Sequence, residues 1–443
     1  MRHRPISSRL FVDNRQRLAA RLGSGSLALV NANDLLPTNL DGTTTYIPNT
    51  DLFHLTGIEQ EQSILLLAPD AHDERQREIL FLRQPNAHVA VWEGPKLTKE
   101  QARAISGVGR IEWLEDFRAH FHHLMCEMDT VWLNSNTHPR AVVDVETRDA
   151  RCIRETQRRY PLHTYRQLNR PMREIRLVKS APEISLLRRA AAITKEGYDR
   201  VMRYVRPGVH EYEVEAEFSH EFTRRRGRFG YQPIIASGSN AGVLHYLSND
   251  QVCARGNLLL LDVGASYANY NADVTRTLPV SGKFTRRQQH VYDAVLRSLR
   301  HSVAGLKPGK LAKVWQKEGE RFIEAELLKL GLLRPRDVRN QDPNHPALKK
   351  YFMHGMGHPL GLDVHDWTAS STPMAVGWVM TVEPGIYLPD EGFAVRLEDN
   401  IVLTLDGHLN LTQDIPIEPN AVEAAMRRRR ALRPAFRRSV SRH

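Results

Sequence analysis

The chain has 443 residues, of which 41% are hydrophobic and 26% charged, and it carries a net charge of +11. These fractions are typical of a globular protein and exclude a low-complexity or fibrous chain, and the length allows two or three domains with separate cores. No apolar run approaches about 18 residues, and the start MRHRPISSRLF has no signal-peptide core, so we expect no membrane partner and a cytoplasmic location.

Up to about residue 170, short apolar runs alternate with helical or polar segments. Four of them have the length and aliphatic content of buried strands: LALVNAN from Leu27, SILLLAP from Ser63, EILFLR from Glu78 and TVWLNSN from Thr130. Strands mixed with helices predict a mixed α/β domain. The arginine-rich, weakly patterned residues 137–176 predict a helix followed by a linker.

A sharper helical pattern then begins. Ser180 and Glu183 have the spacing of a capping box, and Pro182 suits the first turn of a helix. Apolar residues follow at helical spacing, and Pro207-Gly208 comes after them: Ile184, Leu187, Ala191, Tyr198 and Val201. We expect this stretch to be the opening helix of a second domain.

Four acidic residues of that second domain lie within strand-like sequence. They are Asp262, Asp273, Glu383 and Glu398. The run LLLLDVGASYANYNADVTRTLPV predicts a hairpin with an acid on each strand, and the other two acids lie in VMTVEPGIYL and FAVRLEDNIVLT. A buried carboxylate is costly unless a positive group neutralises it. Each acid could pair with a buried arginine such as Arg276 or Arg396, or all four could bind metal ions.

The segment HGMGHPLGLDVHD, residues 354–366, holds three histidines. His354 and His358 have the i, i+4 spacing of a helical zinc site, but the glycines and Pro359 disfavour a helix, and no glutamate follows the first histidine. We expect irregular backbone that places one histidine on a metal and the others toward substrate.

Four carboxylates and one imidazole are typical of two hard or borderline divalent ions that share bridging carboxylates. Oxygen-rich ligation disfavours structural zinc. In two-metal hydrolases the ions lie about 3.5–4 Å apart and hold a bridging water. We therefore predict two divalent metal ions, with Mn²⁺ preferred over Co²⁺ or Zn²⁺.

The three cysteines and the arginine tail complete the inventory. Cys126, Cys152 and Cys253 are far apart and odd in number, which predicts free thiols that serve as small core residues. The last 23 residues carry eight arginines and one glutamate, and so hold seven of the eleven excess positive charges. We expect a basic, disordered tail at 426–443. No nucleic-acid motif accompanies it, so we do not expect specific nucleic-acid binding.

In their order and spacing, the four acids and His358 resemble the metal ligands of the pita-bread metallopeptidases, which include methionine aminopeptidase, aminopeptidase P and prolidase. The strings YFMHGMGHPLGLDVHD, MTVEPGIYL and VRLEDNIVLT resemble the aminopeptidase P and prolidase branch, and YFMHG and LTQDIPIEPNAVEAAM are more similar to aminopeptidase P. TDLFHLTGIEQEQSILLLAP and WEGPKLTKEQA resemble the family's N-terminal domain. The resemblance implies an α/β (α+β) fold, with a creatinase-type mixed α/β domain at 1–172 and a pita-bread catalytic domain at 173–425.

The resemblance also implies a role for each ligand. Asp262 would bind one ion with both oxygens, Asp273 and Glu398 would bridge the two ions, and His358 would be the single imidazole ligand. Glu383 would ligate the second ion and take a proton from the bridging water.

Four further residues match family positions near the substrate. His245, in GVLHYLSND, matches a histidine that binds and polarises the substrate, and His365 one that stabilises the oxyanion. His354 would line the pocket. Arg396 matches an arginine that orients the bridging carboxylate.

The family's substrates imply a hydrolase that releases the N-terminal residue from peptides with proline in the second position, an Xaa-Pro aminopeptidase. Such a bond is a tertiary amide with no N–H and with fixed φ, which needs a dedicated apolar slot. Two alternatives stay open: an Xaa-Pro dipeptidase, or prolidase, and a non-catalytic pita-bread binding protein. The leaving-group side of the slot is expected to be closed by a neighbouring subunit, so we expect a homo-oligomer, a dimer or a tetramer.

Overall fold

The computed structural model describes residues 3–142, 144–366 and 371–427. Its chain divides into two compact units, Met1–Pro182 and Glu183–His443. The expected domain boundary at 172/173 falls within helix α7 (Asn169–Leu177). Of the expected tail, only the first two residues are described, where they end helix α13 (Pro419–Arg427), and the rest lies outside the described residues. Among the described residues, no helix is long and apolar enough to cross a membrane.

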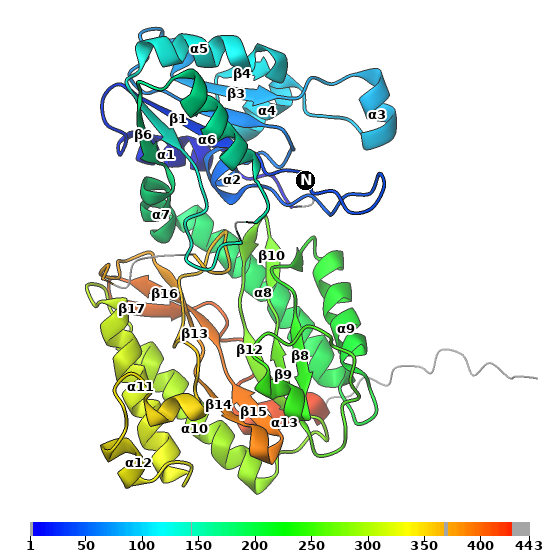
Figure 1. Cartoon of the computed structure of the whole chain (residues 1–443). Coiled ribbons are helices and arrows are strands. Elements are labelled where there is room, and N and C mark those ends of the chain that lie inside the picture. The colour runs from blue at the N-terminus through cyan, green and yellow to red at the C-terminus, as the bar shows by residue number, and fades with distance from the viewer. Residues whose placement is uncertain (1–2, 143, 367–370, 428–443) are drawn as a thin grey trace, which may run out of the picture. The chain divides into compact units, whose positions relative to one another are not determined.

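The described part of unit 1 contains a six-stranded mixed sheet in the order β4-β3-β2-β1-β5-β6 (Figure 1). The strands are β1 (Ser26–Asn31), β2 (Ile64–Leu67), β3 (Glu78–Leu82), β4 (Arg110–Trp113), β5 (Thr130–Leu133) and β6 (Thr164–Gln167). All four predicted strands are confirmed, as β1, β2, β3 and β5. The sequences RIEW and TYRQ of β4 and β6 are too polar to give an apolar run, and they were not predicted.

Alternation along the strands of unit 1 supplies two apolar faces, because successive side chains of a strand point to opposite sides. Ala28 and Val30 pack with residues of α1 (Ser8–Ala19), α2 (Thr50–Thr56), α4 (Lys99–Ser106) and α7. Leu27 and Leu29 pack with residues of α5 (Phe117–Glu127) and α6 (Arg148–Arg159). The unit also contains α3 (Ala87–Glu93), η1 (Glu74–Gln76) and η2 (Leu114–Asp116).

The prediction for residues 137–176 is partly wrong. The helix is present as α6, but β6 and α7 occupy the place of the expected linker. Leu168, Met172 and Ile175 are buried in the same cluster as Ala28 and Val30. Their burial accounts for an ordered helix in a stretch whose sequence is dominated by arginine.

The described part of unit 2 contains four small sheets, in the orders β11-β10-β7, β12-β9-β8, β13-β16-β17 and β14-β15. The strands are β7 (Arg228–Phe229), β8 (Ile234–Ser237), β9 (Leu258–Asp262), β10 (Ala265–Tyr267), β11 (Tyr270–Asn271), β12 (Thr275–Pro279), β13 (Val379–Val382), β14 (Gly385–Leu388), β15 (Phe393–Arg396), β16 (Asp399–Thr404) and β17 (Gly407–Asn410). All strand pairs within these sheets are antiparallel.

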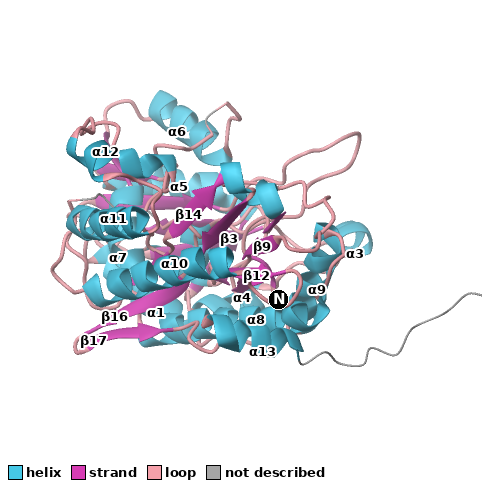
Figure 2. Cartoon of the chain, turned by 90° about the horizontal axis from the view of Figure 1, so that it is seen from below, coloured by secondary structure: helices cyan, strands magenta, loops and turns pink. Residues whose placement is uncertain are grey.

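Helices flank these strands on two sides. The helices are α8 (Ala181–Tyr204), α9 (Glu211–Arg224), α10 (Arg286–Gly305), α11 (Ala312–Lys329) and α12 (Pro335–Arg339), with the short turns η3 (Gly238–Gly242), η4 (Ala347–Lys350) and η5 (Pro389–Glu391). Helices α8 and α9 lie beside β8, β9 and β12, and α10 and α11 lie beyond β13 to β15 (Figures 1 and 2). The predicted opening helix is confirmed as α8. Its buried Tyr198 hydroxyl contacts the carbonyl oxygens of Leu261 and Val274, at 2.9 and 2.8 Å.

The three cysteines are free, as predicted. Only Cys253 is buried, and burial raises the pKa of its thiol to about 12. Cys152 is half-buried and Cys126 is exposed, so the expected core position is correct for Cys253 alone.

A fully buried arginine, Arg276, fastens β12 to the start of β16 and to residues 415–416. Its guanidinium forms an ion pair with Asp399, with a shortest N–O distance of 2.7 Å. It also donates to the backbone carbonyls of Glu398, Ile415 and Pro416, at 2.6, 3.3 and 3.1 Å. Removing only one partner of a buried ion pair is costly, because the other partner then keeps a buried charge that nothing balances.

We therefore predict that Arg276→Met lowers the free energy of unfolding by about 3–5 kcal/mol, because Asp399 then keeps a buried charge without its partner. The matched control is Arg287→Met, which breaks the more exposed pair with Glu391 (2.6 Å) and should cost under about 1 kcal/mol. Thermal and urea unfolding of both variants tests this. Equal losses in the two variants would contradict it.

Candidate metal centre

The four acids of the predicted ligand set lie where the chain leaves one sheet and enters another. Asp262 ends β9, and Asp273 lies two residues before β12, with the short hairpin β10–β11 between them. Glu383 lies between β13 and β14, and Glu398 between β15 and β16. Because β13 pairs with β16 and β14 with β15, both glutamates lie at one crossing between two sheets. The backbone N–H of Glu398 donates to the Thr275 carbonyl at 3.0 Å, which joins this crossing to the β9–β12 hairpin.

The histidine segment is irregular, as predicted: within 354–366 the structure has neither helix nor strand beyond an isolated bridge from Pro359 to Met380. It is pressed against β13. The backbone N–H of Thr381 donates to the His358 carbonyl at 2.8 Å. A Cβ on Gly357 would lie 2.0 Å from the Thr381 carbonyl oxygen, so only glycine fits there.

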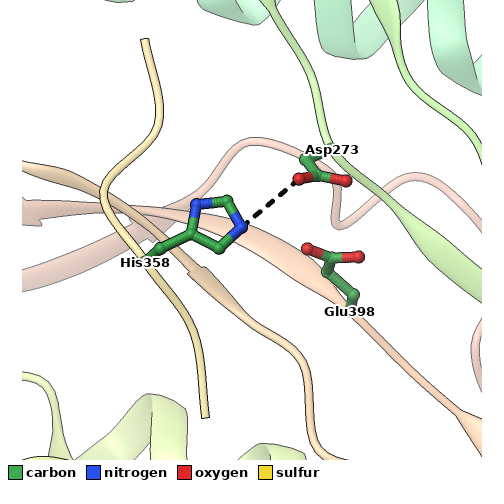
Figure 3. A group of neighbouring side chains, drawn as sticks. All are labelled: Asp273, His358 and Glu398. Carbon is green, nitrogen blue, oxygen red and sulfur yellow. Dashed lines mark ion pairs between the residues drawn. The ribbon is translucent and has the colours of Figure 1, made fainter. Parts of the chain in front are cut away.

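Three of the five expected ligands form a compact group. One potential ligand atom from each of Asp273, His358 and Glu398 lies within 4.8 Å of the others (Figure 3). Nε2 of His358 is 3.5 Å from a carboxylate oxygen of Asp273 and 3.6 Å from one of Glu383. Asp262 is held by Arg396, at 2.5 Å, and by the Tyr231 hydroxyl, which donates at 2.6 Å.

The pKa values of these acids indicate that a cation would stabilise the group. Burial raises the pKa of Glu398 well above its ordinary value, and the negative charges of Asp273 and Glu383 raise it further. Burial likewise raises the pKa of Glu383 to about 7, although the nearby His358 opposes this. Burial also raises the pKa of Asp262, and the charge of Arg396 only partly offsets it. These acids repel one another when ionised, and a divalent ion relieves that repulsion.

His358 responds to the same charges. Burial lowers the pKa of its imidazole, but the bond to Asp273 and the charges of Glu383 and Asp273 outweigh burial and raise it to about 9. Burial raises the pKa of Asp273, and the bond to His358 more than reverses that, so the pKa lies below its usual range. The protonated imidazole supplies positive charge that partly balances the acids, as a bound metal ion would. The donor set of carboxylate oxygens and one imidazole fits hard or borderline divalent ions.

Tyr387 connects the pocket histidine to the acids, and sequence reasoning missed it. Arg396 donates to the Tyr387 hydroxyl at 2.7 Å, and that oxygen lies 2.8 Å from Nε2 of His354. The hydroxyl therefore donates to Nε2, while Nδ1 of His354 donates to the Gly355 carbonyl at 2.8 Å. Burial, together with the charge of Arg396, lowers the pKa of His354 to about 3, so this imidazole is neutral.

Arg396 was expected to orient a bridging carboxylate. Its ion pair is with Asp262, and it reaches Glu398 through Thr275. Arg396 Nε donates to the Thr275 hydroxyl at 3.2 Å, and that hydroxyl donates to Glu398 at 2.7 Å. The other arginine considered, Arg276, forms its ion pair with Asp399; of the four acids it contacts only Glu398, through the backbone carbonyl and not the carboxylate.

The two remaining histidines are exposed. The ring of His365 lies next to that of His358, with centroids 4.2 Å apart. His245 follows η3, and its neighbours Leu244 and Tyr246 pack against a buried cluster that contains Tyr387. The structure thus brings His354, His365 and Arg396 to the ligand group, and it places His245 on a loop packed beside Tyr387.

Comparisons with known proteins agree with this geometry. A family model described as metallopeptidase family M24 matches residues 185–405, and one described as the N-terminal domain of aminopeptidase P matches residues 11–132. The Xaa-Pro aminopeptidase of Escherichia coli is 34% identical over 435 residues, which cover 95% of this chain and 98% of that protein. Xaa-Pro aminopeptidase 3 of Homo sapiens is 30% identical over 416 residues, covering 90% of this chain and 81% of that protein.

Solved structures give the same picture. Zinc-substituted aminopeptidase P of Escherichia coli in complex with product has a TM-score of 0.84 and 34% identity, and covers 96% of this chain and 99% of its own. Proline aminopeptidase P II of Yersinia pestis has a TM-score of 0.84 and 32% identity, and covers 95% of this chain and all of its own. The expected fold, a mixed α/β N-terminal domain followed by a pita-bread domain, is confirmed.

We predict that His358→Ala loses most of its bound divalent metal, because it removes the imidazole from the compact group. His365→Ala and His354→Ala should retain metal, since neither residue belongs to that group. Elemental analysis after loading with Mn²⁺ and desalting measures metal per chain. Loss of metal in His365→Ala together with retention in His358→Ala would show that the ligand is misassigned.

Proposed function

The chain belongs to metallopeptidase family M24 and is a metallo-aminopeptidase, and from this premise we propose that it releases the N-terminal residue from peptides with proline in the second position. The observation that carries the proposal is the compact group of buried Asp273 and Glu398 with half-buried His358, and Glu383 beside it. Relatives named Xaa-Pro aminopeptidase, aligned over nearly the whole chain, support the substrate class.

The proposed proline slot lies beside His354. Its imidazole is neutral, and it packs edge-on against Phe352 and Tyr387, with ring centroids at 4.7 and 5.5 Å. Phe352 and Tyr387 are fully buried, so they hold the His354 ring, and the neutral imidazole is the group proposed to face the pyrrolidine ring. An uncharged ring accepts an apolar group without desolvating a charge.

We propose that Asp262, Asp273, His358, Glu383 and Glu398 together hold two divalent ions, with Mn²⁺ preferred over Co²⁺ or Zn²⁺. Such ions would polarise the scissile carbonyl and lower the pKa of a water molecule. The oxygen-rich donor set supports this preference. Zinc occupies the substituted Escherichia coli relative.

Three side chains near the proposed metal ions have proposed roles in the reaction. Glu383 is proposed to accept a proton from the attacking water. Its carboxylate oxygens lie 3.6 Å from His358 and 3.9 Å from His354, and this position beside the ligand group supports the role. His365, adjacent to His358, is proposed to stabilise the negative charge that forms on the scissile carbonyl oxygen. His245 is proposed to help bind and polarise the substrate.

The alternatives are less well supported. A dipeptidase is not favoured, because the relatives that match along the whole chain are named aminopeptidases. A non-catalytic binding protein would have no need of a buried acid group that requires a cation. We also propose a homo-oligomer, since the neighbouring Val91 and Trp92 of α3 are 81% and 77% exposed and adjacent apolar side chains at the surface can pack against a partner. Three free thiols fit a reducing compartment, and we propose the cytoplasm.

The substrate assignment predicts that replacing proline by alanine in an Xaa-Pro-Xaa tripeptide lowers kcat/KM by about 10–200-fold, because the slot is then unfilled. One lost pocket contact of this size is worth about 1–3 kcal/mol. Steady-state hydrolysis of matched tripeptides, with the Xaa-Pro dipeptide as a third substrate, tests it. Equal turnover of the proline and alanine peptides would contradict proline selectivity, and cleavage of the dipeptide alone would favour a dipeptidase.

The proposed role of His365 predicts that His365→Ala lowers kcat by about 10²–10³-fold while the bound metal remains, because the lost contact acts on charge that appears only in the transition state. The matched variant is His354→Ala, which should act mainly on KM for the proline peptide. Kinetics and metal analysis on the same preparations separate the two roles. A His365→Ala enzyme with unchanged kcat would refute this assignment.

A further inference from the structure

A buried acid outside the ligand group has no role in the proposed mechanism. Glu211 is the first residue of α9 and is fully buried. One of its carboxylate oxygens accepts from the backbone N–H of Ser237 at 2.7 Å and from the Asn240 amide at 3.2 Å. The other accepts from the Tyr246 hydroxyl at 2.7 Å and from the backbone N–H of Gln251 at 3.0 Å. A carboxylate has about four acceptor sites, so both oxygens are saturated.

All four donors belong to one stretch of chain, residues 237–251, which carries His245. Ser237 ends β8, Asn240 lies in η3 and Tyr246 follows His245 directly. At the far end, the N–H of Glu211 donates to the Gln251 carbonyl at 3.0 Å, so backbone and side chain hold the same residue. Glu211 therefore fixes the start, the middle and the end of the loop.

A second acid on α9 supports the same loop. Glu215 accepts from the Asn249 side-chain amide at 2.9 Å, and Asn249 has a left-handed backbone, with φ of 47°. The amide oxygen of Asn249 in turn accepts from the N–H of Ile235 at 3.1 Å, which ties this end of the loop to β8.

The loop is also fixed from the side of the metal group. Leu244 and Tyr246 pack against the cluster that holds Tyr387, while His245 between them is exposed. An exposed side chain keeps a useful orientation only if its backbone is held by its surroundings. Tyr246 is thus held at its ring by that cluster and at its hydroxyl by Glu211.

We infer that Glu211 is the positioning residue for His245: its buried carboxylate sets the loop so that the imidazole meets the carbonyl group of a bound peptide. Glu211 itself touches no substrate. The inference rests on the proposed function, which gives His245 its contact with the substrate.

The test is a double-mutant cycle between Glu211→Gln and His245→Ala. In Glu211→Gln an NH₂ group replaces one of the two accepting oxygens. It would then face two donors of the loop that it cannot accept from, and we expect the loop to shift. We expect Glu211→Gln to lower kcat/KM for an Xaa-Pro-Xaa tripeptide by about 10–100-fold, as for other residues that orient a functional group, with unchanged metal content. In the His245→Ala background the same change should cost less than about threefold, because the group that it positions is already absent.

Two further variants make the result decisive. Tyr246→Phe removes one donor and no volume, so it folds even if Glu211→Gln does not, and it should cost about fivefold, again only when His245 is present. Glu326→Gln is the matched control: Glu326 is equally buried but pairs with Arg297 and Lys329, so stability should fall while kcat/KM stays unchanged.

Wild-type kcat/KM in both loop variants, or equal losses with and without His245, would overturn the inference. A separate readout is the NMR signal of the His245 ring in histidine-labelled protein, identified by its absence in His245→Ala. The signal should shift in Glu211→Gln and stay in place in Glu326→Gln. If the wild type cleaves no Xaa-Pro peptide, the proposed function fails, and the NMR comparison still decides whether Glu211 positions the loop.

Discussion

Mutual repulsion among four carboxylates, two of them buried and two half-buried, is the constraint on which unit 2 depends. Asp262, Asp273, Glu383 and Glu398 are brought together from two hairpins, and each loses solvent that would stabilise its charge. Arg396 balances Asp262, and His358 balances Asp273. The remaining excess of negative charge is what a pair of divalent ions would remove. Metal binding and the stability of this unit are therefore coupled.

The four acids can lie close together because each is at the end of a strand or just outside one. A carboxylate in the middle of a strand would point to one face of its sheet, whereas a residue at a crossing between sheets can turn toward other crossings. Gly357 completes the arrangement, because its missing side chain lets the His358 segment lie directly against the Thr381 carbonyl of β13. The helices on both sides keep water from the back of the strands.

The site residues that could be predicted from the sequence are those that are unusual in their local secondary structure. Acids that end or interrupt apolar strands, such as Asp262 and Glu383, stand out, and so does a histidine segment with too many glycines for a helix. Tyr231, Thr275 and Tyr387 escape notice because tyrosine and threonine are common strand residues and need no special explanation. Strands β4 and β6 escape for the opposite reason, since their polar residues give no apolar run. The contacts of Arg396 with Asp262 and Thr275 depend on how two hairpins meet, which spacing along one strand cannot reveal.

The contacts of Arg276 constrain the order in which this part of unit 2 can form during synthesis. Its partners include Glu398 and the carbonyls of residues 415 and 416, which leave the ribosome 122 to 140 residues after it. Domains form progressively from the N-terminus as the chain grows. Until those late residues emerge, the guanidinium lacks two of its backbone acceptors. A nascent chain therefore completes the contacts of Arg276, and with them the junction of β12 and β16, only after residues 415 and 416 have been made.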